Sequence, residues 1–196
     1  MKLKPVKKVF TFFFFGILLL SLNSFHSENK RQQTGKPTIV LIFLDDGGFG
    51  DFKPFGQPRY PTPHVQSLAE EGRSFHNFYV PQAVCSASRA ALLSGCYPGR
   101  TGVFGAHAPE QKGLDPKFAT MGEVLQKNGY KTACFGKWHI GDQEATRPPA
   151  RGFDESCGLM YSNDMWKHHP ENPEFWGKWP LKFWENDKIK IESVSK

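Results

Sequence analysis

The sequence predicts an α/β fold, in which helices alternate with the strands of a largely parallel sheet. Three observations predict it. Residues 38–44 form a continuous apolar run rich in β-branched side chains, residues 62–72 and 120–129 carry helix signals at both ends, and a strand pattern follows each of these helices. With 196 residues, 39% hydrophobic content and 15 prolines, the chain predicts one loop-rich globular domain.

The first 26 residues have the anatomy of a secretory signal peptide. Four lysines precede an apolar run over residues 9–22, and a polar stretch begins at Asn23. Because an ordinary membrane-spanning helix needs about 20 apolar residues, we expect cleavage and export to the periplasm or the exterior, with no permanent membrane anchor. Residues 27–36 are polar and predict a flexible mature N-terminus before a folded part over residues 37–196.

Charge and cysteine content limit the classes of partner. Cleavage of the leader would remove four lysines from a chain whose formal net charge is +6, so the basic charge reflects targeting and no nucleic-acid partner is expected. The four cysteines include no Cys-x-x-Cys pair, which disfavours a zinc site, and three disulfide connectivities remain open. They are Cys85, Cys96, Cys134 and Cys157.

The first predicted unit is a strand followed by a helix. Residues 38–44 predict a buried strand that reaches the surface at Asp-Asp-Gly-Gly. Thr62 is the expected helix N-cap, Pro63 the first helical residue and Gly72 the stop. A second strand is expected over residues 74–79.

The second predicted unit repeats this order. Thr120 and Glu123 form a possible capping box, Gly129 ends the helix, and residues 131–135 predict the next strand. Ligands of parallel sheets bind beyond the carboxyl ends of the strands. Polar residues occupy two such places, Asp45-Asp46 after the first strand and Lys137-Trp138-His139 after the later one.

Cys85 stands at the predicted start of a short helix that ends at Gly95. The free N–H groups of a helix start, together with Arg89, favour an anionic ligand or a thiolate at this position. These features alone leave two interpretations open, a functional cysteine and an ordinary buried or disulfide-bonded one.

Four segments together resemble the sulfatase family. Cys85-Ser-Ala-Ser-Arg89 with Leu93-Ser94-Gly95 resembles the family signature, and three further segments resemble its other landmarks in the same order, over about residues 37–165. These are Asp45-Asp46-Gly-Gly-Phe-Gly-Asp51, Gly136-Lys137-Trp138-His139-Ile140-Gly141 and Gly152-Phe153-Asp154-Glu155. The resemblance implies a type I, arylsulfatase-like protein with an alkaline-phosphatase-like fold, whose mixed, mostly parallel sheet is flanked by helices and is incomplete at the C-terminus.

The resemblance also implies a catalytic chemistry. A formylglycine-generating maturation enzyme would oxidise Cys85 to an aldehyde, whose hydrate attacks sulfur with one hydroxyl and expels sulfate with the other. Asp45, Asp46 and the modified Cys85 would bind one Ca²⁺ ion. The substrate would be a sulfated small molecule, such as an aryl sulfate, or a sulfated polysaccharide.

The remaining roles implied by the resemblance belong to three side chains. Arg89 would hydrogen-bond the formylglycine hydroxyl and hold the carboxylates on the metal side. Lys137 would bind a sulfate oxygen, and His139 would hydrogen-bond the diol or the sulfate. A solvated turn at the two aspartates, a surface ion pair for Arg89, a solvated lysine and a core histidine are the corresponding structural alternatives.

Two departures from the family pattern qualify these expectations. The family's other metal ligands, leaving-group histidine and second lysine are absent, so we expect a truncated sequence that binds calcium poorly by itself. Ala87 replaces the frequent proline, which leaves the maturation system open. The alternative functions are a phosphonate or phosphate ester hydrolase of the same superfamily, and a non-catalytic secreted fragment.

Overall fold

The computed structural model describes residues 35–194, in two units divided after Leu44. In the first unit, residues 35–44 contain no helix or strand, and apolar side chains such as Ile42 are exposed. The strand predicted over residues 38–44 is therefore wrong for the described chain. A strand needs a neighbour to pair its backbone groups, and the described sheet does not include this run. The predicted signal peptide lies outside the described residues.

The second unit begins at Asp45 and carries all of the described helices and strands. Within residues 35–194, every helix is too short or too polar to cross a membrane. The elements, with η for 3₁₀ helices, are η1 Phe49–Asp51, α2 Pro63–Glu71, α3 Cys85–Ser94, α4 Pro98–Thr101, α5 Met121–Lys127, β1 Ala133–Lys137, η2 Glu144–Thr146, η3 Pro149–Arg151, β2 Glu155–Leu159, α6 Pro173–Trp176, β3 Phe183–Glu185 and β4 Lys188–Ile191.

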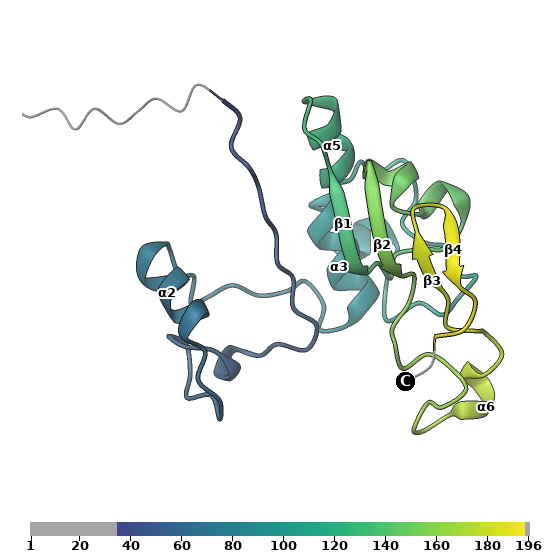
Figure 1. The fold of residues 1–196 in the computed structure, drawn as a ribbon, viewed down its shortest axis with the longest axis horizontal. Helices are drawn as coiled ribbons and strands as arrows, with labels where there is room; N and C mark the ends of the chain where they lie inside the picture. Colours follow the sequence, from purple (N-terminus) through teal and green to yellow (C-terminus); the bar gives the residue numbers. More distant parts are fainter. Residues whose placement is uncertain (1–34, 195–196) are drawn as a thin grey trace, which may run out of the picture. The chain divides into compact units, whose positions relative to one another are not determined.

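The four strands form one mixed sheet in the order β1-β2-β3-β4 (Figure 1). Strands β1 and β2 run parallel, with Lys137 opposite Leu159, whereas β3 pairs antiparallel with both β2 and β4. Because β1 and β2 are parallel, their carboxyl ends lie at the same edge of the sheet. This edge carries the polar residues that follow both strands.

Helix α2 has the bounds that its sequence signals predict. It starts at Pro63 after Thr62 and is followed by Gly72. The Thr62 hydroxyl does not cap the helix but accepts a hydrogen bond from the backbone N–H of Lys53, at 3.1 Å. The strand predicted over residues 74–79 is wrong, since this segment is irregular and largely exposed, with no strand partner in the described sheet.

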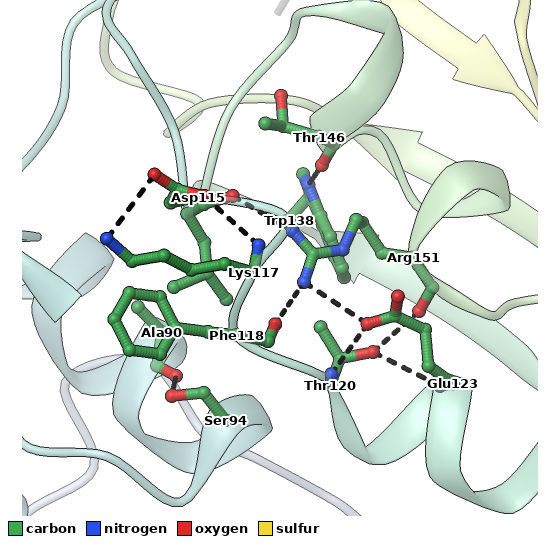
Figure 2. A network of polar contacts seen from close by, with 11 residues as sticks. Ala90, Ser94, Asp115, Lys117, Phe118, Thr120, Glu123, Trp138, Thr146 and Arg151 are labelled. Carbon is green, nitrogen blue, oxygen red and sulfur yellow. Dashed lines mark hydrogen bonds and ion pairs between the residues drawn. The ribbon is translucent and has the colours of Figure 1, made fainter.

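The predicted capping box at α5 is confirmed. The Thr120 hydroxyl accepts from the backbone N–H of Glu123 at 3.2 Å, and Glu123 Oε2 accepts from the backbone N–H of Thr120 at 2.6 Å. Buried Arg151 joins this box, because its guanidinium donates to Glu123 and to the Phe118 carbonyl oxygen (Figure 2). It also donates to the carbonyl oxygen of Leu114. The network fixes α5 just before β1, which starts two residues later than predicted.

The hydrophobic core lies under the sheet edge that carries the polar residues. Its buried members come from α3, from the loops that follow it, and from the segments just beyond β1 and β2. They are Ala90, Val103, Leu114, Trp138, Ile140, Met160, Tyr161 and Met165. The core therefore anchors α3 and the segments after β1 and β2, which contain predicted site residues.

Candidate active site

Lys137 is the last residue of β1 and connects three parts of the chain. Its Nζ donates to Asp45 Oδ2 at 2.7 Å and to Ser162 Oγ at 3.2 Å. Ser162 is buried and follows β2 directly beyond Met160 and Tyr161. Ser162 was not among the predicted site residues, although a position just after a strand is a sequence signal for such a residue.

Arg89 reaches the same carboxylate from α3. Its Nη2 lies 3.4 Å from Asp45 Oδ1, and its Nη1 donates to the backbone carbonyl of Lys137. The Arg89 side chain is 11% exposed and that of Lys137 is 13% exposed, so water screens both cations only weakly. The two cations and the single carboxylate therefore leave a net positive charge in this cluster.

The pKa of Asp45 reports this charge balance. Burial raises its pKa, but the hydrogen bond and charge of Lys137, together with the charge of Arg89, outweigh burial and hold the pKa below its ordinary value. Asp45 is therefore ionised at neutral pH and neutralised by its two partners.

His139 is completely buried, with its backbone at φ 62°. Its Nε2 lies 2.8 Å from the carbonyl oxygen of His107, and its ring packs edge-to-face on Tyr161, with ring centroids 5.6 Å apart. A carbonyl only accepts, so Nε2 carries the proton and Nδ1 is the unprotonated nitrogen. Nδ1 is buried and has no hydrogen-bond partner within residues 35–194.

Burial lowers the pKa of His139 to about 4, and the neighbouring charges of Lys137 and Arg89 act in the same direction. The hydrogen bond to His107 opposes this change without reversing it. The imidazole is consequently neutral across the physiological pH range.

Trp138, between Lys137 and His139, anchors this segment in the hydrophobic core. Its indole is buried and donates from Nε1 to the Thr146 carbonyl at 2.8 Å (Figure 2). The same ring packs edge-to-face on Phe153. The backbone N–H groups of Trp138 and His139 continue the pairing with the β2 side of the sheet, at 2.9 and 3.0 Å. The Lys-Trp-His segment is thus held by the core at its middle residue.

Cys85 is the first residue of α3 and follows Val84 in an extended conformation. It is half-buried and free, as are the three other cysteines, so the structure contains no disulfide among them. Cys85 and Arg89 are four residues apart on α3 and share one face of the helix. This places a free cysteine on the helix face from which Arg89 reaches Asp45.

The predicted metal ligands do not form a calcium site by themselves. Asp45 is engaged by two cations, and exposed Asp46 has a backbone φ of 57°. Across residues 35–194, no group of three or more His, Cys, Asp or Glu side chains is placed to hold an ion. Since calcium takes 6 to 8 oxygen ligands, the described donor set does not fit the ion unaided.

Lys137 and Ser162 lie at the carboxyl ends of two parallel strands, which is where the ligand sites of α/β proteins are found. The chain belongs to the sulfatase family, whose match covers residues 37–191. It is 45% identical over 133 residues to human (Homo sapiens) arylsulfatase A, a match that covers 66% of this chain and 26% of the relative. It is 38% identical over 131 residues to human N-acetylgalactosamine-6-sulfatase, covering 62% and 25% of the two chains.

Solved structures agree with the predicted fold class. The crystal structure of Ps i-CgsB superposes with a TM-score of 0.69 and 31% identity, covering 81% of this chain and 38% of that chain. A structure solved with its substrate D-glucosamine-2-N,6-O-disulfate superposes with a TM-score of 0.62 and 25% identity, covering 81% and 28%. The alkaline-phosphatase-like fold expected from the sequence is confirmed, and the chain spans about a quarter of the length of the curated relatives it matches.

Proposed function

We propose that the protein to which this chain belongs hydrolyses sulfate esters, with Cys85 as the precursor of its nucleophile. The proposal rests on one observation: Arg89 and Lys137 both form ion pairs with Asp45. These three residues come from three separate segments that resemble the sulfatase family. Cys85 shares the helix face of Arg89. Two weakly screened cations suit the single negative charge of a sulfate ester.

Conversion of Cys85 would be a two-electron oxidation by an oxidant supplied with the maturation enzyme. Formally, water and the CH₂–SH group give an aldehyde and hydrogen sulfide, with two electrons and two protons passing to the oxidant. The hydrated aldehyde would supply one hydroxyl that attacks sulfur and displaces the alcohol, and a second whose deprotonation reforms the aldehyde and releases sulfate. Half-burial of the Cys85 side chain leaves it reachable for both the modification and a substrate.

The chain's own residues would provide charge and proton transfer. Lys137 and Arg89 would stabilise the negative charge on the sulfate oxygens in a site that water screens weakly. His139 would accept a proton at Nδ1, the nitrogen left without a hydrogen by the bond from Nε2 to His107. Neutrality of the imidazole keeps this nitrogen available at physiological pH.

Calcium is proposed as a cofactor of a protein of the relatives' full length. Asp45 and Asp46 would contribute hard carboxylate ligands, and the ligands missing from residues 35–194 would have to be supplied by further residues. Export through the leader at residues 1–26 is proposed on its sequence pattern alone.

Sulfated carbohydrate is the proposed substrate class, with aryl sulfates as model substrates. One relative is named an N-acetylgalactosamine-6-sulfatase, one solved neighbour holds k-i-k-neocarrahexaose, and another holds D-glucosamine-2-N,6-O-disulfate. The names of these proteins support a sugar carrying a sulfate ester, without selecting the sugar.

Turnover of an aryl sulfate and of the matching aryl phosphate tests this proposal. The full-length protein is produced with a formylglycine-generating enzyme, and mass spectrometry of the tryptic peptide over residues 74–89 measures conversion of Cys85. We expect preference for the sulfate and loss of turnover in Cys85→Ala, with Cys96→Ala as the matched control that retains it. Unmodified Cys85 in active protein, or preference for the phosphate, would overturn the proposal.

A further inference from the structure

A short segment after α4 is tied to the first turn of α3. The backbone N–H of His107 donates to Ser86 Oγ at 2.9 Å, and the backbone N–H of Ala87 donates to the Gly105 carbonyl at 3.3 Å. The N–H of Gly105 donates in turn to Gln82 Oε1 at 3.3 Å. Three hydrogen bonds therefore fix residues 105–107 against the residues that surround Cys85.

The same segment holds His139. The carbonyl of His107 accepts the 2.8 Å hydrogen bond from His139 Nε2, while the N–H of His107 is bound by Ser86. One residue thus links the neighbour of Cys85 to the buried imidazole through two backbone groups. Ser86 and His139 are both 0% exposed, so water cannot replace either partner without a change in packing.

We propose that Ser86 is a positioning residue, whose hydroxyl fixes the His107 carbonyl and thereby selects the Nε2–H tautomer of His139. The inference deepens the proposed function, because that tautomer leaves Nδ1 as the proton acceptor. In a neutral imidazole, the hydrogen bonds with surrounding groups determine which of the two ring nitrogens carries the proton. Without the Ser86 anchor, the carbonyl is free to move and the Nδ1–H tautomer becomes populated.

The charged and polar surroundings of the imidazole do not replace this selection. Lys137, Arg89 and the His107 ring lie close enough to influence its charge, and Tyr161 contacts the ring edge-to-face. The cations disfavour protonation of either nitrogen, but the hydrogen bond to the His107 carbonyl distinguishes Nε2 from Nδ1.

Two variants disturb the segment from opposite ends. Ser86→Ala removes the anchoring hydroxyl and adds no atoms. Gly105→Ala strains the backbone instead, because Gly105 has φ +70°. A Cβ there meets no atom within 4 Å, so the substitution introduces no steric clash. Ser94→Ala is the matched control, since Ser94 also lies on α3 but its hydroxyl donates to the Ala90 carbonyl (Figure 2) and accepts from the backbone N–H of Cys96, both outside residues 105–107.

The ring ¹⁵N chemical shifts of His139, assigned with a His139→Asn variant of the full chain, report the tautomer directly. We expect the Nε2–H form in the parent chain and in Ser94→Ala, and a mixture of tautomers in Ser86→Ala and Gly105→Ala. Unchanged shifts in both segment variants overturn the proposal. Circular dichroism checks that each variant is folded, and Ser86→Thr, which keeps the hydroxyl, should restore the parent shifts.

Kinetics of the full-length protein give a second readout. Because Ser86 adjoins the modified residue, kcat is expressed per molecule with converted Cys85, and mass spectrometry measures that fraction. On this basis, Ser86→Ala should lower kcat about threefold to tenfold with little change in KM. An unchanged kcat contradicts the inference. If the parent protein has no sulfatase activity, the proposed function fails, while the ¹⁵N experiment still decides the role of Ser86.

Discussion

Lys137 Nζ lies 2.7 Å from Asp45 Oδ2, although the two residues are 92 positions apart in the sequence. The pair joins the carboxyl end of β1 to the aspartates that begin the second unit. Arg89 binds the other oxygen of Asp45 and the carbonyl of Lys137. A triangle of two cations and one carboxylate therefore organises three segments whose connection the sequence leaves unspecified.

Replacing Lys137 by methionine should raise the pKa of Asp45. Burial raises that pKa and the two cations lower it, so removal of one cation moves it back toward or above its ordinary value. Stability linked to Asp45 is present above the ordinary pKa and is lost as pH falls through the lower folded value. Carboxyl ¹³C titration measures the shift, with Lys131→Met, an exposed lysine, as the control; an unchanged Asp45 pKa would contradict the assignment.

The same Lys137→Met variant should lower kcat/KM of the full-length protein on an aryl sulfate roughly 100-fold. The reason is loss of a weakly screened cation from the proposed sulfate site. Lys131→Met should leave kcat/KM unchanged, and equal rates for the two variants would exclude Lys137 from the site.

His139 should make the free energy of unfolding fall as pH drops from about 6.5 toward 4. Its folded pKa of about 4 lies below the ordinary value of 6.5, so in this interval the unfolded chain binds the extra proton. The stability is fully present above pH 6.5 and is lost toward the folded pKa. His139→Asn tolerates the positive φ and should flatten this slope in urea titrations from pH 4 to 7. A slope equal to that of the parent would mean that His139 titrates normally.

Calcium should bind the 196-residue chain only weakly. Residues 35–194 offer no cluster of three potential ligands, and Asp45 is already neutralised by two cations. Isothermal titration should give a Kd in the millimolar range or weaker, as expected for a site with too few carboxylates. Micromolar binding that survives Asp45→Asn and Asp46→Asn would reveal a site elsewhere in the chain.

The sequence predicted the helices of this chain better than its strands, because helix signals are local. Thr120 and Glu123 form their capping box through residues three positions apart, and Pro63 begins α2 as its fixed φ favours. Residues 38–44 have the composition of a strand but pair with none of the described strands. Strand formation depends on a neighbour, which a local pattern does not supply.

The candidate site shows the same division between local and distant information. The sequence predicted a short helix that starts at Cys85 and contains Arg89, and the Lys137 to His139 segment was expected at the end of a strand. Ser162 was not predicted, because its role depends on the parallel pairing of β2 with β1. The contact of His139 with His107 also lies across two loops that no periodicity connects.

Glu123→Gln should destabilise the chain at pH 7 by about 1 kcal/mol, the typical cost of weakening one charge-assisted hydrogen-bond set. Burial raises the pKa of Glu123, but the Thr120 N–H and Arg151 outweigh it and lower the pKa below the ordinary 4.5. The stabilisation is thus present above pH 4.5 and disappears as pH falls below it. Urea denaturation should show a larger difference at pH 7 than at pH 3, and exposed Glu144→Gln should show none at either.

Gly158→Ala should weaken both the fold and the site. Gly158 faces Gly136 across the parallel β1-β2 pair, with φ +155°, and a Cβ would overlap the Gly136 carbonyl. Relief of that overlap must displace β1 next to Lys137, so we expect a loss of roughly 2 kcal/mol in the free energy of unfolding. Urea denaturation measures it.

Gly99→Ala provides the matched control for this substitution, because a Cβ at Gly99 meets no atom within 4 Å. Its effect should stay within about 0.5 kcal/mol. Displacement of β1 should also lengthen the contact between Lys137 and Asp45, so Gly158→Ala should raise the Asp45 pKa in the ¹³C titration and Gly99→Ala should not. Equal stability of the two variants would show that the β1-β2 pair adapts without moving Lys137.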